Sequence, residues 1–167
     1  LGTIMKNYGY GIAIAGCHGK TTTTSMVSII LKNAGLDPTI LIGGEIEAIN
    51  GNVMVGRSDY FVTEACEYCE SFLKFYPYAA VILNIEKDHL DYYKDIDHII
   101  SAFKKFARLV PESGSLVVCS DNEHAINISK EVKCNVLTYG IKNKADFNAK
   151  NIKYDSLGHP TFEVRLR

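Results

Sequence analysis

The sequence predicts an α/β domain in which a mostly parallel sheet is flanked by helices. Short apolar runs recur along the chain and alternate with segments whose apolar residues have helical spacing. The first run, 11–15, leads through a glycine-rich loop into a helical segment, which is the layout of a phosphate-binding loop. Near the C-terminal end, two alternating segments surround a turn, and they predict an antiparallel hairpin.

The first third of the chain contains two of the expected strands and one helix. Residues 1–10 show no clear pattern and are expected to be a linker or the end of a preceding element, while 11–167 form the domain. The continuous apolar run 11–15 predicts a buried strand. The helix over 25–34 should end at Gly35. Its expected apolar side consists of Met26, Ile29, Ile30 and Ala34.

The middle of the chain continues the alternation. A strand is expected over 38–42, a small hairpin over 45–55 with its turn at Asn50-Gly51, and a strand over 59–64. A short helix over 71–76 should stop before Pro77, and a strand over 78–83 should run into the polar loop 84–91. The spacing of the apolar residues from Ile96 to Ala107 then predicts a helix.

The last third completes the predicted sheet. Strands are expected over 116–119 and 136–139, with a helix over 122–130 between them. The segments 147–154 and 161–167 form the expected hairpin. The chain starts without Met and stops on a strand pattern, so we expect it to be truncated at both ends and incomplete at the C-terminus.

Composition excludes several classes of function. The 167 residues are 47% hydrophobic and 22% charged with a net charge of −1, so there is no electrostatic reason to expect a nucleic-acid partner. No apolar run approaches the roughly 20 residues of a membrane helix, and no membrane partner is expected. Five cysteines without secretory features predict reduced thiols and a cytoplasmic protein. We interpret Cys66-x-x-Cys69 as two unpaired thiols rather than a zinc or redox site.

The glycine-rich loop carries the first candidate chemistry. Its glycines, Gly16 and Gly19, let backbone N–H groups turn toward an anion, and the following helix adds unpaired N–H donors. Lys20 would supply positive charge to the β- and γ-phosphates, and the Thr21 hydroxyl could ligate Mg²⁺. The usual first glycine of such a loop is absent, because Ile14 stands in its place. A strand-to-helix turn that binds nothing is the alternative.

Polar residues at two other strand ends should lie beside this loop, because ligands of open α/β sheets bind beyond the carboxyl ends of the strands. Glu64 ends an apolar strand and is a candidate metal ligand, with a solvated acid as the alternative. His89 is a second candidate, although a lone histidine is more often structural. Asp88 and Asp91 could orient that histidine or cap the next helix.

The loop cysteine also carries a prediction about reactivity. Cys17 lies at a predicted helix N-terminus, next to His18 and close to Lys20, a setting that lowers a thiol pKa. We therefore expect alkylation to be faster at Cys17 than at Cys119, which lies in a predicted strand, and we expect ATP with Mg²⁺ to protect Cys17.

Three ordered motifs together resemble the Mur ligases of bacterial cell-wall synthesis. They are Ala15-Gly-Cys-His-Gly-Lys-Thr-Thr-Thr-Thr24, Glu64-Ala-Cys-Glu67 and Asn84-Ile-Glu-Lys-Asp-His-Leu-Asp-Tyr-Tyr93. The resemblance covers nearly the whole chain. His18 and the run of four threonines resemble the branch that joins L-alanine to UDP-N-acetylmuramate.

The resemblance implies roles for individual residues. The loop from Gly16 to Thr22, comprising Gly16, Cys17, His18, Gly19, Lys20, Thr21 and Thr22, would bind ATP. Thr21 and Glu64 would ligate one Mg²⁺, and Glu64 and His89 would contribute to a second metal. Lys20, Glu64 and His89 would be catalytic, in an ATP-dependent reaction that forms an amide through an acyl phosphate.

The resemblance also implies partners and departures. The substrates would be UDP-N-acetylmuramate and L-alanine, and N- and C-terminal domains of the same enzyme would complete the site, with the adenine contacts beyond Arg167. Cys17 stands where threonine is commoner, and Cys66 and Cys69 stand where aspartate is frequent. Some sister ligases carry a carbamylated lysine near the place of Lys104 or Lys105, although a solvated helix face is the simpler interpretation.

Other functions stay open at this point. Within the same class, the chain could belong to the ligase that reattaches recycled tripeptide to the same UDP-sugar. A nucleotide-binding switch or ATPase module that acts through partners needs the same loop but not an Asp-His-x-Asp segment. A non-catalytic scaffold that keeps the fold is the third alternative.

Overall fold

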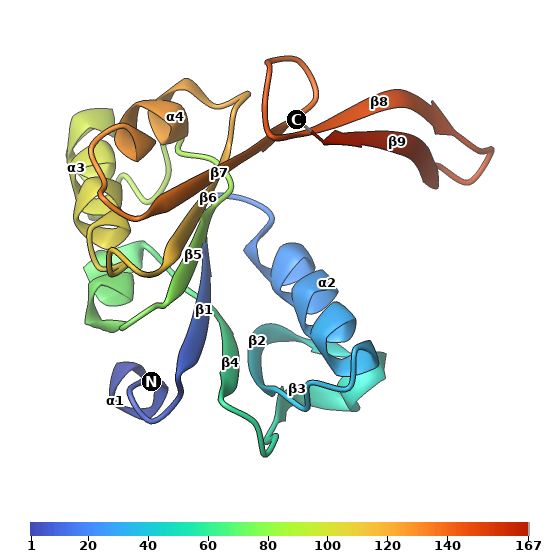
Figure 1. The fold of residues 1–167 in the computed structure, drawn as a ribbon. Coiled ribbons are helices and arrows are strands. Elements are labelled where there is room, and N and C mark those ends of the chain that lie inside the picture. Colours follow the sequence, from blue (N-terminus) through green and yellow to red (C-terminus); the bar gives the residue numbers. More distant parts are fainter. Residues whose placement is uncertain (167) are drawn as a thin grey trace.

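The computed structural model describes residues 1–166, which form one mixed sheet with helices on both faces (Figure 1). The strands are β1 (Tyr10–Ala15), β2 (Thr39–Ile46), β3 (Gly51–Met54), β4 (Tyr60–Glu64), β5 (Ala79–Ile82), β6 (Ser115–Cys119), β7 (Asn135–Gly140), β8 (Phe147–Tyr154) and β9 (Pro160–Leu166). The helical segments are α1 (Gly2–Met5), α2 (Lys20–Asn33), η1 (Glu47–Ile49), η2 (Tyr68–Lys74), α3 (Ile96–Ala107) and α4 (Glu123–Ser129).

The strand order is β3-β2-β4-β1-β5-β6-β7-β8-β9. In this order, the seven neighbouring strands that begin with β2 and end with β8 run parallel. β3 and β9 pair antiparallel with β2 and β8 at the two edges. The structure therefore confirms the predicted fold class, including the C-terminal hairpin. No described helix has both the length and the apolar character that crossing a bilayer requires.

The centre of the sheet brings three loops together. β1 lies between β4 and β5, with Ile14 opposite Glu64 and Ala15 opposite Ile82. The three strands are parallel, so their carboxyl ends lie at the same edge. The loops that follow them therefore meet there, and they contain the motifs singled out in the sequence.

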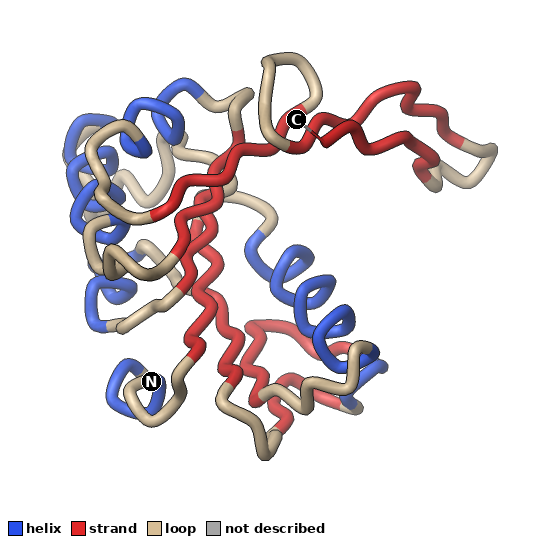
Figure 2. Tube along the Cα trace, viewed as in Figure 1, coloured by secondary structure: helices blue, strands red, loops and turns tan. Residues whose placement is uncertain are grey.

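Helix α2 covers one face of the sheet, and α3 and α4 cover the other (Figures 1 and 2). α2 begins at Lys20, five residues before the predicted start. The prediction of its apolar side was wrong, since Met26, Ile30 and Ala34 are exposed. Thr24 and Ser28 are buried instead. The loop sets the angle at which α2 leaves β1, and these two small side chains face the sheet.

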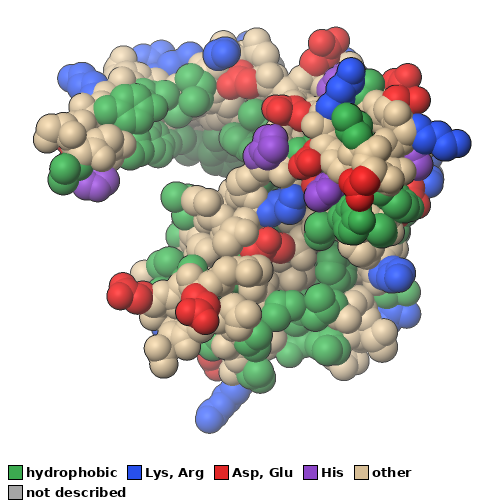
Figure 3. Space-filling view, turned by 180° about the vertical axis from the view of Figure 1, so that it is seen from behind, with side chains coloured by type: hydrophobic (Ala, Val, Ile, Leu, Met, Phe, Trp, Pro, Cys, Tyr) green, Lys and Arg blue, Asp and Glu red, His purple; other side chains and the backbone are tan. Residues whose placement is uncertain are grey.

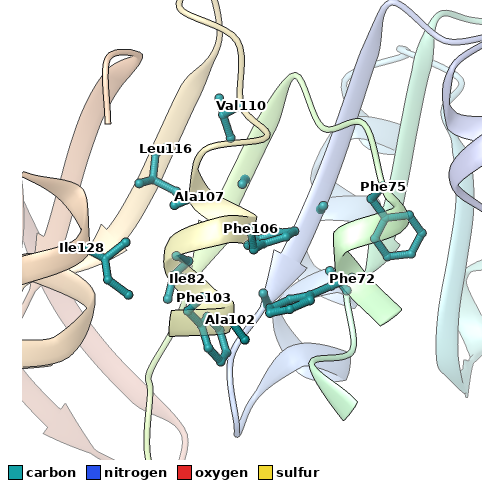
Figure 4. Packing of buried hydrophobic residues seen from close by; sticks show 14 of the residues in the cluster. Phe72, Phe75, Ile82, Ala102, Phe103, Phe106, Ala107, Val110, Leu116 and Ile128 are labelled. Atoms are coloured by element: carbon teal, nitrogen blue, oxygen red, sulfur yellow. The ribbon is translucent and has the colours of Figure 1, made fainter. Parts of the chain in front are cut away.

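Aromatic packing fixes the segment that follows β4 (Figure 4). Phe72 of η2 stacks on Phe106 of α3 with ring centroids 4.7 Å apart, and it meets Phe103 edge to face at 5.2 Å. The short helix expected over 71–76 is a 3₁₀ segment over 68–74, kinked at Cys69 and Glu70, which both have φ of 52°. Burial of Phe72 therefore holds an irregular turn in one place.

The N-terminal residues pack on the domain. α1 places Met5 in the core, where it is fully buried. The Tyr8 hydroxyl donates a hydrogen bond of 3.0 Å to Oγ1 of Thr39 in β2. These contacts connect residues 1–10 to the first half of the sheet.

The two hairpins differ in their surroundings. The predicted turn at Asn50-Gly51 lies between β2 and β3, which pair antiparallel, and Asn50 has φ of 53°. The β8–β9 hairpin projects from the body (Figure 1), and all of β9 is exposed. Figure 3 shows hydrophobic side chains along the side of this overhang that faces the body, and Phe162 and Val164 are among the exposed apolar residues. The last position of the predicted strand, Arg167, lies outside the described residues.

Candidate functional site

The loop between β1 and α2 has the backbone of an anion-binding turn. Gly16 has φ of 147° and Gly19 has φ of 83°, both in the region that favours glycine. A Cβ on Gly16 would lie 2.9 Å from Cβ of Leu83, which excludes any larger residue. Gly19 caps the 14-residue helix α2, and no side chain among residues 1–166 caps the N–H groups of its first turn. An anion can therefore accept hydrogen bonds from the helix N-terminus.

Asn84 braces this loop from the end of β5. Its Oδ1 accepts from the His18 N–H at 2.9 Å, and its Nδ2 donates to the His18 carbonyl at 3.0 Å. The Asn84 carbonyl accepts from the Cys17 N–H at 3.3 Å. The sequence analysis gave Asn84 no role, although its position directly after an apolar strand was a usable signal. The His18 side chain is exposed, with Nε2 3.7 Å from a carboxylate oxygen of Glu86.

Lys20 turns back onto its own loop and meets a buried acid. Its Nζ donates to the carbonyls of Gly16 at 2.6 Å and Cys17 at 3.3 Å. It also lies 3.0 and 3.2 Å from the two carboxylate oxygens of Glu67, which is fully buried. A buried carboxylate is costly to desolvate unless a cation compensates it, so the pair holds each partner in place.

His89 lies on the other side of the same acid. Its Nε2 is 3.5 Å from Oε1 of Glu67 and 3.9 Å from Oδ2 of Asp88, and its backbone has φ of 49°. Asp88 also accepts from the His89 N–H at 2.8 Å. The ring centroids of Tyr68 and His89 lie 4.9 Å apart. Three side chains therefore converge: Lys20 at the start of α2, Glu67 after β4 and His89 after β5.

The structure decides between the two roles considered for the flanking aspartates. Helix α3 is capped by Asp95, whose side chain accepts from the His98 N–H, so neither Asp88 nor Asp91 caps it. Asp88 contacts the histidine as described above. Asp91 accepts from the Tyr68 hydroxyl at 3.0 Å, and this hydrogen bond is the main cause of the raised pKa of Tyr68.

Glu64 and Thr21 border a different spot, the glycine pair in β2. Oε1 of Glu64 accepts from the Gly43 N–H at 2.7 Å, and Glu64 is half-buried. A Cβ on Gly44 would lie 3.2 Å from Cγ2 of Thr21. Because Gly43 and Gly44 have no side chains, they leave room for the side chains of Glu64 and Thr21. Thr22, in the first turn of α2, is exposed.

The acid next to His89 was not the one the sequence analysis singled out. Among residues 1–166, the ion-pair partners of His89 are Glu67 and Asp88, and Glu64 is not among them. Glu67 was quoted in the motif but given no role. Its signal was the spacing Glu64-x-x-Glu67 at a strand end, which offers two acids without telling which one turns inward. The metal-binding roles of Thr21, Glu64 and His89 stay predictions.

The prediction of a reactive thiol at Cys17 was wrong in its physical basis. Cys17 is buried, and burial is the main cause that raises the pKa of its thiol to about 11. The charges of Glu67 and Asp88 act in the same direction, whereas Lys20 lowers it less. Its Sγ donates to the Glu86 carbonyl at 3.3 Å and accepts from the Glu86 N–H at 3.2 Å. The thiol ties two loops together.

The remaining candidates have ordinary surroundings. Cys66 and Cys69 are exposed and free. Lys104 and Lys105 form surface ion pairs with Glu131 at 2.6 Å and with Glu70 at 3.0 Å. The lysine contacts are those of a solvated helix face.

Fold and site together define a class of protein. A glycine-rich strand–loop–helix turn with an inward lysine, at the central carboxyl edge of a parallel sheet, is the arrangement of P-loop nucleotide-binding domains. Residues 14–165 match the family model described as the Mur ligase middle domain. The chain belongs to the Mur ligase family.

The sequence relatives include proteins named as one particular kind of Mur ligase. Over 167 residues, the chain is 58% identical to a UDP-N-acetylmuramate–L-alanine ligase from Caldanaerobacter subterraneus subsp. tengcongensis. The match covers all of this chain and 36% of that protein. The chain therefore spans about a third of the length of such relatives.

Solved structures agree with the fold. The UDP-N-acetylmuramate–alanine ligase of Thermotoga maritima superposes with a TM-score of 0.83 at 27% identity, covering 98% of this chain and 36% of that one. A UDP-N-acetylmuramate:L-alanyl-γ-D-glutamyl-meso-diaminopimelate ligase from Neisseria meningitides superposes with a TM-score of 0.82 at 28% identity, covering 98% and 53%. The structural likeness alone does not separate these two kinds of ligase.

Proposed function

We propose that this chain is the ATP-binding part of a ligase that joins L-alanine to UDP-N-acetylmuramate by way of an acyl phosphate. The observation that carries the proposal is the convergence of Lys20, Glu67 and His89 beside an uncapped helix N-terminus. Identity of 56–60% to proteins named UDP-N-acetylmuramate–L-alanine ligase favours L-alanine as the acceptor.

The loop fits the phosphates of ATP. Its two positive-φ glycines shape the turn, and within the described part of the chain no side chain caps the first-turn N–H groups of α2. Lys20 has three donor hydrogens and sits within the loop, so a phosphate oxygen can replace one of its carbonyl contacts. Glu67 would then hold the lysine from behind, where it limits the positions that Nζ can adopt.

Thr21 and Glu64 fit Mg²⁺ because a hydroxyl and a carboxylate oxygen are the ligand types that this cation prefers. Both side chains border the Gly43-Gly44 pair, at the edge of the phosphate loop. His89 and Glu64 stay our proposed contributors to a second metal. Bound Mg²⁺ would offset the repulsion between the substrate carboxylate and the polyphosphate.

The chain would act together with further domains. Since it spans 36% of the length of its relative, we expect N- and C-terminal domains of the same enzyme to supply the contacts to the UDP-sugar, the amino acid and the adenine. The free cysteines and the use of ATP fit the cytoplasm as the place of the reaction.

The test uses the full-length protein that contains this chain. Ligation is measured with UDP-N-acetylmuramate, ATP and Mg²⁺, with L-alanine and the tripeptide L-alanyl-γ-D-glutamyl-meso-diaminopimelate compared as acceptors at equal concentration. We expect product and ADP to form with L-alanine. Faster turnover with the tripeptide would show that the chain belongs instead to the ligase that reattaches recycled tripeptide. ATP hydrolysis without ligation of either acceptor would instead favour an ATPase module.

A further inference from the structure

One group of metal-ligating side chains lies next to the phosphate loop and outside the proposed Mg²⁺ ligands. The Sγ of Cys17, a carboxylate oxygen of Glu67 and one of Asp88 lie within 4.8 Å of one another. They come from the phosphate loop, the turn after β4 and the loop after β5. Cys17 and Glu67 are buried, and Asp88 is half-buried.

We propose that Cys17, Glu67 and Asp88 form a binding site for a thiophilic divalent cation such as Zn²⁺. One thiolate and two carboxylates suit tetrahedral Zn²⁺, whose bonds to sulfur and oxygen are roughly 2.3 Å and 2.0–2.2 Å long. Mg²⁺ prefers oxygen ligands, so the thiol distinguishes the two cations. His89 is the nearest fourth donor, with its Nε2 3.5 Å from Oε1 of Glu67 and 3.9 Å from Oδ2 of Asp88.

The surroundings already contain one partner for a metal-bound thiolate. As the metal–sulfur bond forms, the Cys17 thiol releases its proton to solvent and its hydrogen bond to the Glu86 carbonyl is lost. The Glu86 N–H, which donates to Sγ at 3.2 Å, continues to donate to the thiolate. The thiolate and the two carboxylates supply the negative charge that faces the cation.

Binding would compete with Lys20 for Glu67. The lysine Nζ lies 3.0 Å from this carboxylate, so a cation at the site removes its buried partner. Lys20 would then lose the contact that limits the positions of its Nζ. We therefore infer that Zn²⁺ inhibits use of ATP. This consequence rests on the proposed function, whereas the metal site itself does not.

Co²⁺ alone, titrated into the metal-free full-length protein without nucleotide, tests the site. We expect a thiolate-to-cobalt charge-transfer band that disappears in Cys17→Ser. Asp88→Asn should weaken Co²⁺ binding by at least about tenfold, while the matched control Cys66→Ser, an exposed thiol outside the group, keeps the band. Circular dichroism checks that each variant is folded, and Asp88→Asn decides the matter should Cys17→Ser fail to fold.

Two results would overturn the site: a wild-type protein without the band, or a band of unchanged affinity in Asp88→Asn. The inhibitory role has its own test, which is ATP hydrolysis at saturating Mg²⁺ with increasing Zn²⁺. The Zn²⁺ concentration for half inhibition should rise at least about tenfold in Asp88→Asn relative to wild type. Equal sensitivity would end the inhibitory role. Absence of any ATP hydrolysis, with the cobalt band present, would count against the proposed function and leave the metal site standing.

Discussion

Glu64 and Glu67 are the same residue type three positions apart, yet the structure gives them opposite surroundings. Glu64 is half-buried at the end of β4 and accepts from a backbone N–H of β2. Glu67 is fully buried, faces Lys20 and lies beside His89. The comparison teaches that a carboxylate at a strand end can stay partly open to solvent, whereas one in the following turn can be buried against a lysine of the neighbouring loop.

The largest expected effect comes from removing the cation that Glu67 holds. In the full-length protein, Lys20→Ala should lower the rate of ATP hydrolysis by at least about a hundredfold, since it removes positive charge from the phosphates. The variant should also be less stable, because the buried Glu67 is left uncompensated at a cost of about 3–5 kcal/mol. Urea unfolding and ATPase rates measure both effects, and an unchanged ATPase rate would contradict the role of the loop.

The next effect concerns the packing that fixes the Glu67 turn. Phe72→Ala should destabilise the protein by about 3–5 kcal/mol, because it removes a fully buried ring from between Phe103 and Phe106. The matched control is Phe162→Ala in the hairpin, whose side chain is 50% exposed. A smaller loss of stability for Phe72→Ala than for Phe162→Ala in urea unfolding would show that the turn is held by other contacts.

The comparison itself is tested by two isosteric variants. Glu67→Gln should lower the free energy of unfolding by about 1–3 kcal/mol, because a buried charged hydrogen bond to Lys20 is lost. Glu64→Gln keeps an acceptor for the Gly43 N–H and should change stability by less than about 0.5 kcal/mol. It should instead raise the Mg²⁺ concentration needed for half-maximal activity. Equal losses of stability in the two variants would remove the distinction between the acids.

The smallest expected effect is a difference in labelling. With a thiol pKa of about 11, Cys17 holds only about one part in a thousand as thiolate at pH 8, and its labelling should accelerate as the pH rises toward that pKa. Iodoacetamide followed by mass spectrometry should therefore modify the exposed Cys66 and Cys69 before Cys17. Labelling of Cys17 first would mean that the phosphate loop opens and exposes its thiol.

Much of the fold followed from patterns that are local in sequence. Apolar runs marked the parallel strands, Asn50-Gly51 marked the turn between β2 and β3, and the alternating segments marked the C-terminal hairpin. The face of α2 did not follow, because its apolar residues suggested one side while the sheet packs on Thr24 and Ser28. Helical spacing describes which residues share a face, but the partner layer decides which face is buried.

The sequence by itself determined the phosphate loop, since its two glycines, Lys20 and the following helix act within a few residues of one another. It also placed Glu64, Glu67 and His89 at strand ends that had to meet at one edge. Only the tertiary structure decided which acid faces Lys20. That choice depends on the kinked turn at Cys69 and Glu70 and on the burial of Phe72 against α3, which lies about thirty residues further along the chain. The tertiary structure also buried Cys17, and this burial raises the pKa of its thiol more than the nearby charge of Lys20 lowers it.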